Sequence, residues 1–293
     1  MSGQALNFDR LRDEELSLLS LDDELDIVDL FESVINSSPN HDIKEISQRF
    51  IDGLIKLAPG KSLDTQTLPR STWFTLNRIA ACIDRGHYGQ DVLVTTVRKL
   101  NEVEGWKDLP EFWIAMRECW NLSPTNNLEA KDEMEFTAEE WLNLNSFAAR
   151  LYNGPHVGCL ISFASCELSE GLEGEPKDDD RPEPETRLQV SCEWIVHSGW
   201  RLIRESLLNS YTDPKEKLES RYSNPYSIGP LFTGLRGFSL ERWGFWKRRL
   251  FELREDNIYG EITYKSIDEA IEVMTGIERD ILEKSNIDVL FFP

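Results

Sequence analysis

The residues best suited to bind a ligand lie in one short stretch, residues 238–254. Trp243 and Trp246 supply flat apolar surfaces, and Lys247 and Arg254 project cations into the same apolar arc of a helix. This combination could line a pocket that meets an anionic or carbonyl group, or the two cations could extend along apolar surface with their charged ends in water. A nearby carboxylate would make the cations structural, whereas an unpaired position beside a cavity would make them functional.

Three further residues are candidates for the same pocket. Trp141 would add a third indole, and Asn145 lies at the edge of the apolar arc of its helix, where it needs a hydrogen-bond partner. We favour a neighbouring helix backbone over a ligand as that partner. Tyr226 belongs to a loop that could fold over the Trp243 face as a lid, or cover an aromatic surface permanently.

The element that must position the aromatic residues is a helix. Ser239 is a suitable N-cap, and Phe238 and Trp243 occupy the two positions of a hydrophobic staple. On the resulting helical wheel, five charged residues fall outside the apolar arc, namely Arg242, Arg248, Arg249, Glu241 and Glu252. The wheel therefore predicts a core helix with two cations on its apolar side.

Periodicity along the rest of the chain predicts an all-α fold, an irregular bundle or array of about nine to ten helices. Apolar residues at three- and four-residue spacing indicate helices over residues 42–57 and 90–103, and a capping box begins another at Thr137. In a helix predicted over residues 186–209, Gly199 would let a neighbouring helix approach closely.

Acidic and proline-rich segments interrupt the helical pattern. We expect an acidic, loosely ordered N-terminal segment over residues 1–40 and a single helical domain over residues 41–293, with any subdomain break near 123–136. Residues 170–185 predict a disordered insertion, because a charged, proline-containing segment buries too little apolar surface to fold. A long loop rich in Pro, Gly and aromatics, over residues 211–237, leads into the aromatic helix.

Two other patterns suggest chemistry on first inspection. Asp22, Asp23 and Asp26 match the D-D-x-x-D pattern with which isoprenoid-processing enzymes, also all-helical, bind magnesium diphosphate. Too little helix precedes them to build the cavity this needs, so we interpret them as a solvated face. His87 lies beside Tyr88 in a loop without a Ser, Cys or Asp constellation nearby in sequence, and we interpret it as a surface histidine.

The composition argues against nucleic-acid binding and against association with a membrane. The 293 residues carry a formal charge of -21, which repels nucleic acid and anionic membranes. Five cysteines without a C-x-x-C pair indicate reduced thiols, and no apolar run approaches the length of a membrane span. We expect a cytoplasmic protein, with the nucleus as the alternative compartment because residues 247–249 could act as a short nuclear signal.

The aromatic stretch also carries a family resemblance. Residues 242–249 read Arg-Trp-x-Phe-Trp-Lys-x-Arg behind the Gly- and Pro-containing residues 229–234. This RWxFWKxR signature resembles a family of fungal proteins known as domain of unknown function number thirty-six thirty-two. Residues 140–151 are similar to its other recurrent stretch, so the resemblance covers residues 42–283. It implies a largely helical intracellular fungal protein and gives no catalytic residue to transfer.

Two function classes fit these observations. The first is a non-enzymatic scaffold or regulatory interaction protein, with an unknown protein partner and without cofactor, metal, nucleic acid or membrane. The second is a small-molecule-binding protein or a tailoring enzyme of fungal specialised metabolism, with an aromatic pocket around Trp243 and Trp246. We prefer the first, because nucleophile, phosphate-loop, dinucleotide and metal motifs are absent. An enclosed pocket above about 300 Å³ beside the aromatic helix would reverse that preference.

Overall fold

The computed structural model describes residues 5–13, 21–38, 41–57, 67–125, 135–155, 157–175, 183–212, 226, 228–256 and 258–285. Across these ranges the chain forms eleven α-helices, one 3-10 helix and one π-helix, and no strand. The predicted all-α fold is confirmed, with slightly more helices than the nine to ten expected. The chain divides into two compact units, Met1–His156 and Val157–Pro293, so the division falls later than the break suggested near residues 123–136.

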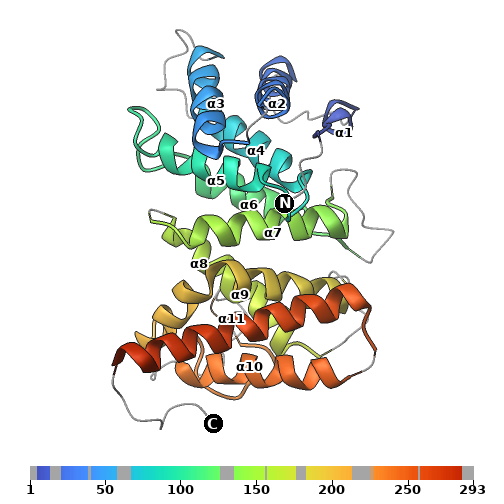
Figure 1. Cartoon of the computed structure of the whole chain (residues 1–293), viewed down its shortest axis with the longest axis vertical. Helices are drawn as coiled ribbons and strands as arrows, with labels where there is room; N and C mark the ends of the chain where they lie inside the picture. The colour runs from blue at the N-terminus through green and yellow to red at the C-terminus, as the bar shows by residue number, and fades with distance from the viewer. Residues whose placement is uncertain are drawn as a thin grey trace. The chain divides into compact units, whose positions relative to one another are not determined.

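In the described residues, unit 1 is a set of seven α-helices (Figure 1). Its core contains many buried aromatic side chains. Its helices are α1 (Asp9–Asp13), α2 (Leu21–Asn36), α3 (Ile43–Leu57), α4 (Thr67–Ala81), α5 (Gly89–Leu100), α6 (Phe112–Trp120) and α7 (Ala138–Tyr152). Phe31 meets Phe50 edge-on with ring centroids 5.0 Å apart, and Trp73 meets Trp106 at 5.1 Å. Such pairs add to the stabilisation that comes from burying apolar area.

The described residues near the N-terminus belong to this core, where we expected a loosely ordered segment. Phe8 and Phe31 are buried with ring centroids 5.9 Å apart. The backbone N–H of Leu6 donates to the side chain of Asn36 at 3.0 Å, and that amide donates back to the Leu6 carbonyl at 2.8 Å. The segment is acidic overall, but its apolar residues lie on one side. The spacing of the apolar residues decides whether a segment is buried more than its net charge does.

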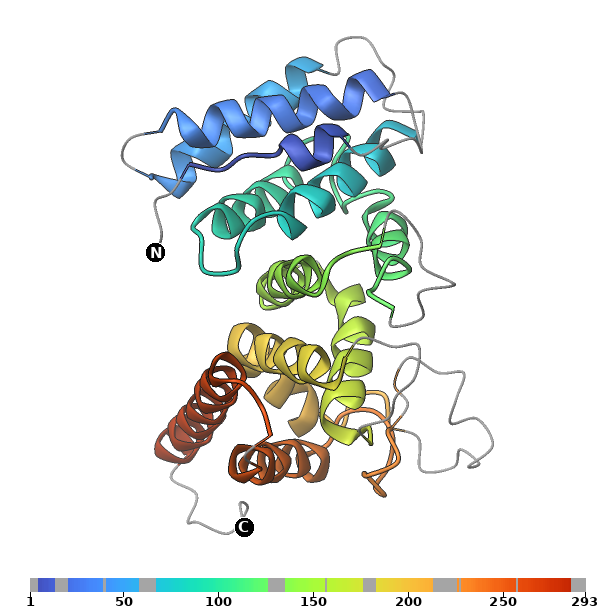
Figure 2. The same ribbon diagram turned by 90° about the vertical axis from the view of Figure 1, so that its right-hand side faces the viewer.

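Unit 2 is built on two long helices, α9 (Pro184–Leu207) and α11 (Glu261–Ser285), which lie side by side (Figures 1 and 2). Its other elements are η1 (Gly158–Leu160), α8 (Ile161–Leu168), the π-helix η2 (Ser169–Glu173) and α10 (Leu240–Glu255). A Cβ atom added at Gly199 of α9 would lie 2.8 Å from Ile277 Cδ1 and 3.3 Å from Val273 Cγ1, both on α11. The close helix approach predicted at Gly199 is therefore confirmed.

Both predicted N-caps are present. The Ser239 side chain accepts a hydrogen bond from the Arg242 backbone N–H at 3.1 Å. Thr137 and Glu140 form the reciprocal capping box at the start of α7. Each cap satisfies backbone donors that a helix N-terminus would otherwise leave without a partner.

The two predicted loop segments lie only partly within the described residues. Residues 176–182 of the acidic insertion, and 213–225 and 227 of the aromatic loop, lie outside them. The start of the insertion differs from the prediction of disorder, because Glu173 closes the η2 turn with a fully buried side chain. Within the described helices, none is both long and apolar enough to cross a membrane.

Candidate functional site

The aromatic helix α10 directs both predicted tryptophans into the interior of unit 2. Trp243 and Trp246 are fully buried, and Phe238 packs edge-on against Trp246 with ring centroids 6.1 Å apart. Arg242 contradicts the helical wheel, which put it outside the apolar arc, because its side chain is 0% exposed. A helical wheel assumes that a charged side chain faces solvent. The Arg242 guanidinium can be buried because a buried carboxylate from another segment pairs with it.

That carboxylate belongs to Glu173 of η2, and it accepts hydrogen bonds from two other segments, α10 and the loop before it. Arg242 Nε donates to Glu173 Oε1 at 2.6 Å and Trp246 Nε1 to the same oxygen at 2.7 Å. The Gly229 N–H donates to Glu173 Oε2 at 2.7 Å, and Arg242 Nη1 donates to the Gly237 carbonyl at 2.7 Å. Because the buried charges are matched and hydrogen-bonded, this cluster fastens the loop before α10 to η2.

Lys247 has a partner of the same kind on α11. Its ammonium group forms an ion pair with Glu278, and Trp243 Nε1 donates to the other oxygen of that carboxylate at 2.8 Å. Lys247 is half-buried and Glu278 is buried. A nearby carboxylate was the condition for a structural role, so the geometry favours that role for Lys247.

Arg254 lies apart from this cluster, whereas Tyr226 lies at its edge, where its backbone carbonyl accepts the Gly237 N–H at 3.2 Å. Arg254 is exposed rather than on the apolar arc, its Nε donates to Asp268 at 2.6 Å, and its guanidinium lies 5.1 Å from the Tyr264 ring centroid. The hydrogen bond to Asp268 raises the pKa of Arg254. Tyr226 stacks on Tyr211 with ring centroids 4.1 Å apart, and burial raises its pKa. Neither contact involves the tryptophans of α10.

The other two candidates, Trp141 and Asn145, lie on α7 in unit 1. Trp141 is buried against Trp120, with ring centroids 4.9 Å apart. The Asn145 side chain is fully buried and donates to the Trp141 carbonyl at 2.9 Å, a backbone partner within its own helix. The residues predicted to share one aromatic pocket are thus divided between the two units.

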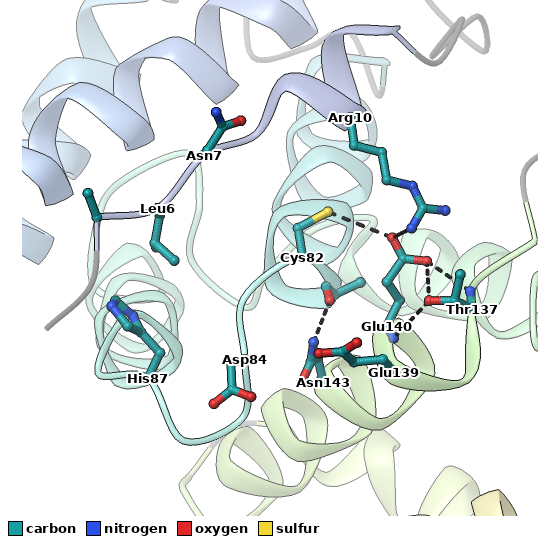
Figure 3. A pocket seen from close by; sticks show the side chains of 12 residues that line it. Leu6, Asn7, Arg10, Cys82, Asp84, His87, Thr137, Glu139, Glu140 and Asn143 are labelled. Atoms are coloured by element: carbon teal, nitrogen blue, oxygen red, sulfur yellow. Dashed lines mark hydrogen bonds and ion pairs between the residues drawn. The ribbon is translucent and has the colours of Figure 1, made fainter. Parts of the chain in front are cut away.

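Unit 1 contains a pocket that sequence reasoning did not find (Figure 3). It has a volume of about 460 Å³ and three walls. The N-terminal segment, residues 5–10, forms one wall, the end of α4 and the link to α5, residues 81–87, form the second, and residues 137–143 of α7 form the third. Asn143 joins the last two walls, because its amide donates to the Ala81 carbonyl at 2.9 Å and its oxygen accepts the Arg85 N–H at 2.9 Å.

Glu140 is the best-anchored charge in this unit 1 pocket. Its Oε2 accepts the Thr137 backbone N–H at 2.8 Å and the Thr137 hydroxyl at 2.9 Å, through the capping box. Its Oε1 forms an ion pair with Arg10 Nη1 at 2.5 Å, and Cys82 Sγ lies 4.0 Å from the same oxygen (Figure 3). The cap of α7 therefore holds a carboxylate in place for a cation from the N-terminal segment.

Negative charge predominates on the pocket walls. Asp84 and Glu139 are exposed on the second and third walls. Asp84 accepts the Gly86 N–H at 2.8 Å, and within the described residues neither carboxylate has an ion pair. Cys82 lies among these groups, and burial, with a smaller contribution from Glu140, raises its pKa to about 12. At neutral pH the thiol is therefore protonated and a weak nucleophile.

His87 also lines this pocket, and its predicted surface position is wrong. The imidazole is 3% exposed, and its Nδ1 accepts the Gly89 N–H at 3.0 Å. Glycines beside a histidine suggested an open loop, but the turn that connects α4 to α5 places the imidazole in the interior. The only local signals for the pocket were this histidine and the capping box, because its third wall comes from residues 5–10.

No group of three or more His, Cys, Asp or Glu side chains among the described residues could hold a metal ion. Of the D-D-x-x-D residues, Asp26 is exposed on α2, and the side chains of Asp22 and Asp23 lie outside the description.

A match to a known protein family covers parts of both units. The family described as "Protein of unknown function (DUF3632)" matches residues 73–250, more than half of the chain. The protein belongs to this family, and the resemblance read from the sequence is confirmed. The match includes the second and third walls of the unit 1 pocket and the Glu173–Arg242 pair, but not Arg10 or Glu278. No curated protein and no solved structure matches the chain.

Proposed function

We propose that this protein is a non-enzymatic interaction protein and that the unit 1 pocket is its recognition site. The observation that carries the proposal is the pocket itself, about 460 Å³ with an excess of carboxylates on its walls. Pockets of this size with a few fixed polar groups are the usual form of a site that encloses a small molecule, and a single long side chain of a partner has similar dimensions. The carboxylates of Asp84 and Glu139 would provide the recognition.

The state of the groups in the pocket supports binding over catalysis. Cys82, its one thiol, has a pKa of about 12, far above the value of an activated cysteine nucleophile. Glu140 already accepts hydrogen bonds from Thr137 and pairs with Arg10, so its charge has a structural use. Both facts favour a preformed surface that recognises a partner.

The aromatic helix supports the same choice. The polar atoms of Trp243, Trp246 and Lys247 that would have met a small molecule are engaged by Glu173 and Glu278. An aromatic binding site around α10 therefore loses the groups that were to orient its ligand. All five cysteines are free thiols, which supports a reducing compartment, and we extend the proposal to the cytoplasm or nucleus.

The test is affinity capture from a native extract with the full chain in three forms. The pocket variant combines Asp84→Asn, which keeps an acceptor for the Gly86 N–H, with Glu139→Gln. The matched control combines Glu102→Gln with Glu104→Gln, which removes two exposed carboxylates of unit 1 outside the pocket. We expect proteins that the wild type and the control retain and the pocket variant loses.

Two results would contradict the proposal. Identical protein sets on all three forms would remove the pocket as the recognition site. Conversion of an extracted metabolite by the purified wild type, abolished in the pocket variant, would make the pocket catalytic.

A further inference from the structure

The unit 1 pocket combines apolar walls with anionic groups at fixed places. Leu6 and Ala81 contribute apolar surface, and Asp84 and Glu139 contribute carboxylates from two different walls. Lysine and arginine side chains have the complementary form, an apolar stem with a cationic end. We infer that the pocket receives a lysine or arginine side chain of a partner polypeptide, an inference that rests on the proposed function.

The ion pair between Arg10 and Glu140 indicates how such a group is held. The Arg10 guanidinium enters the pocket from the N-terminal segment and reaches the carboxylate at 2.5 Å, while 49% of its side chain remains exposed. The α7 wall of the pocket therefore already binds a guanidinium, which the chain's own Arg10 supplies. Arg10 occupies one of the three carboxylates, and a partner would use the other two.

The remaining carboxylates are suited to bind a cation at low cost. Asp84 and Glu139 are exposed, so a partner's charge would keep part of its hydration when it pairs with them. Their mutual repulsion and that with Glu140 would fall when a cation enters. The formal charge of -21 would accelerate encounter with a basic partner at low salt.

The shape of the pocket favours a side chain on a polypeptide over a free amine. At about 460 Å³ the space exceeds what one ammonium group fills, and it takes the stem and flanking backbone as well. Along one side runs the non-helical segment of residues 5–8, whose Leu6 backbone groups are held by Asn36. This fixed edge gives the flanking residues of a partner a surface to lie against.

The experiment measures fluorescence anisotropy of short labelled peptides on the full chain. The probe is a peptide library with a central lysine or arginine and randomised uncharged flanks, and the reference library carries glutamine at the centre. We expect the basic library alone to bind, and the Asp84→Asn, Glu139→Gln variant to lose about fivefold or more in affinity. The Glu102→Gln, Glu104→Gln control should bind as the wild type does, and added salt should weaken binding.

A second variant tests the place of Arg10. Arg10→Gln should raise the affinity for the basic library, because it frees Glu140 Oε1 while Thr137 still holds Oε2. Arg117→Gln on α6 is the matched control, since it removes one exposed cation of unit 1 outside the pocket. An equal gain in both variants, or a loss in Arg10→Gln alone, would contradict the role of Arg10 as an internal occupant.

The outcomes separate this inference from the proposed function. If capture depends on the pocket while the basic library fails to bind, the ligand class is wrong and the binding function stands. If spermidine binds as tightly as the best peptide, the polypeptide assignment is wrong. If all variants unfold at the wild-type urea concentration and none changes either assay, both proposals fail.

Discussion

Glu173 and Arg242 form an ion pair in which both side chains are 0% exposed, with Arg242 Nε 2.6 Å from Glu173 Oε1. A buried ion pair is costly to desolvate, so it persists only where its remaining hydrogen-bonding capacity is also satisfied. Here Trp246, Gly229 and the Gly237 carbonyl supply those contacts. The pair thereby connects η2, the loop before α10 and α10 itself.

Removing the Glu173 carboxylate should destabilise the protein strongly. Glu173→Ala leaves the Arg242 guanidinium buried without its counter-charge, and we expect a loss of about 3–5 kcal/mol in the free energy of unfolding. Urea denaturation followed by tryptophan fluorescence measures it. Glu252→Gln breaks an exposed pair with Arg249 and should cost less than about 1 kcal/mol. Equal effects of the two changes would refute the structural role of Glu173.

Lys247→Ala should reduce stability moderately, by about 1–2 kcal/mol, because Glu278 keeps the Trp243 N–H but loses its cation. Lys247→Met, which retains an apolar stem of similar length, separates the charge from the packing. Thermal unfolding of both variants gives the comparison. A Lys247→Ala protein of unchanged stability that had lost affinity for a small molecule would restore the aromatic pocket on α10.

The cysteines should differ in reactivity with pH. Burial raises the pKa of Cys82, Cys119 and Cys166 to about 12, whereas Cys159 is exposed and has a pKa raised to a smaller extent. A raised pKa keeps a thiol protonated over more of the pH range, so iodoacetamide at about pH 8 should label Cys159 first. Labelling of Cys82 should remain slow at that pH and should become faster as the pH is raised. Peptide mass mapping of the native protein resolves the order, and early labelling of Cys82 would contradict it.

Thr137→Ala should affect both stability and the unit 1 pocket. The change removes the cap of α7, which typically costs about 1 kcal/mol, and it also removes the hydroxyl that holds Glu140 opposite Arg10. Thr137→Ser should restore both, because serine can make the same hydrogen bonds. Circular dichroism during heating measures the stability, and full stability in Thr137→Ala would show that the cap contributes nothing.

The sequence predicted those structural features that depend on residues close together in the chain. Ser239 and Thr137 cap the helices that they were expected to cap, because a cap depends on residues within one turn. Gly199 marked a close helix approach, since the absence of a Cβ atom matters wherever a neighbour packs. The all-α fold followed from the spacing of apolar residues.

Partners from distant segments could not be predicted in this way. Arg242 and Glu173 are 69 positions apart, and a helical wheel holds no information on what lies opposite a side chain. The unit 1 pocket likewise draws on residues 5–10, 81–87 and 137–143. Each of these segments has an ordinary composition, and the pocket exists only once α4 and α7 pack together with the N-terminal segment.

The position of Glu173 has a consequence for synthesis of the chain on the ribosome. Its carboxylate emerges 69 residues before Arg242, an interval of about 3 to 14 s at ordinary rates of translation. Throughout that time the carboxylate has to remain hydrated, because an unpaired charge is not buried. We therefore expect unit 2 to close only after α10 has been made. Every helix of unit 1 has already been synthesised by then.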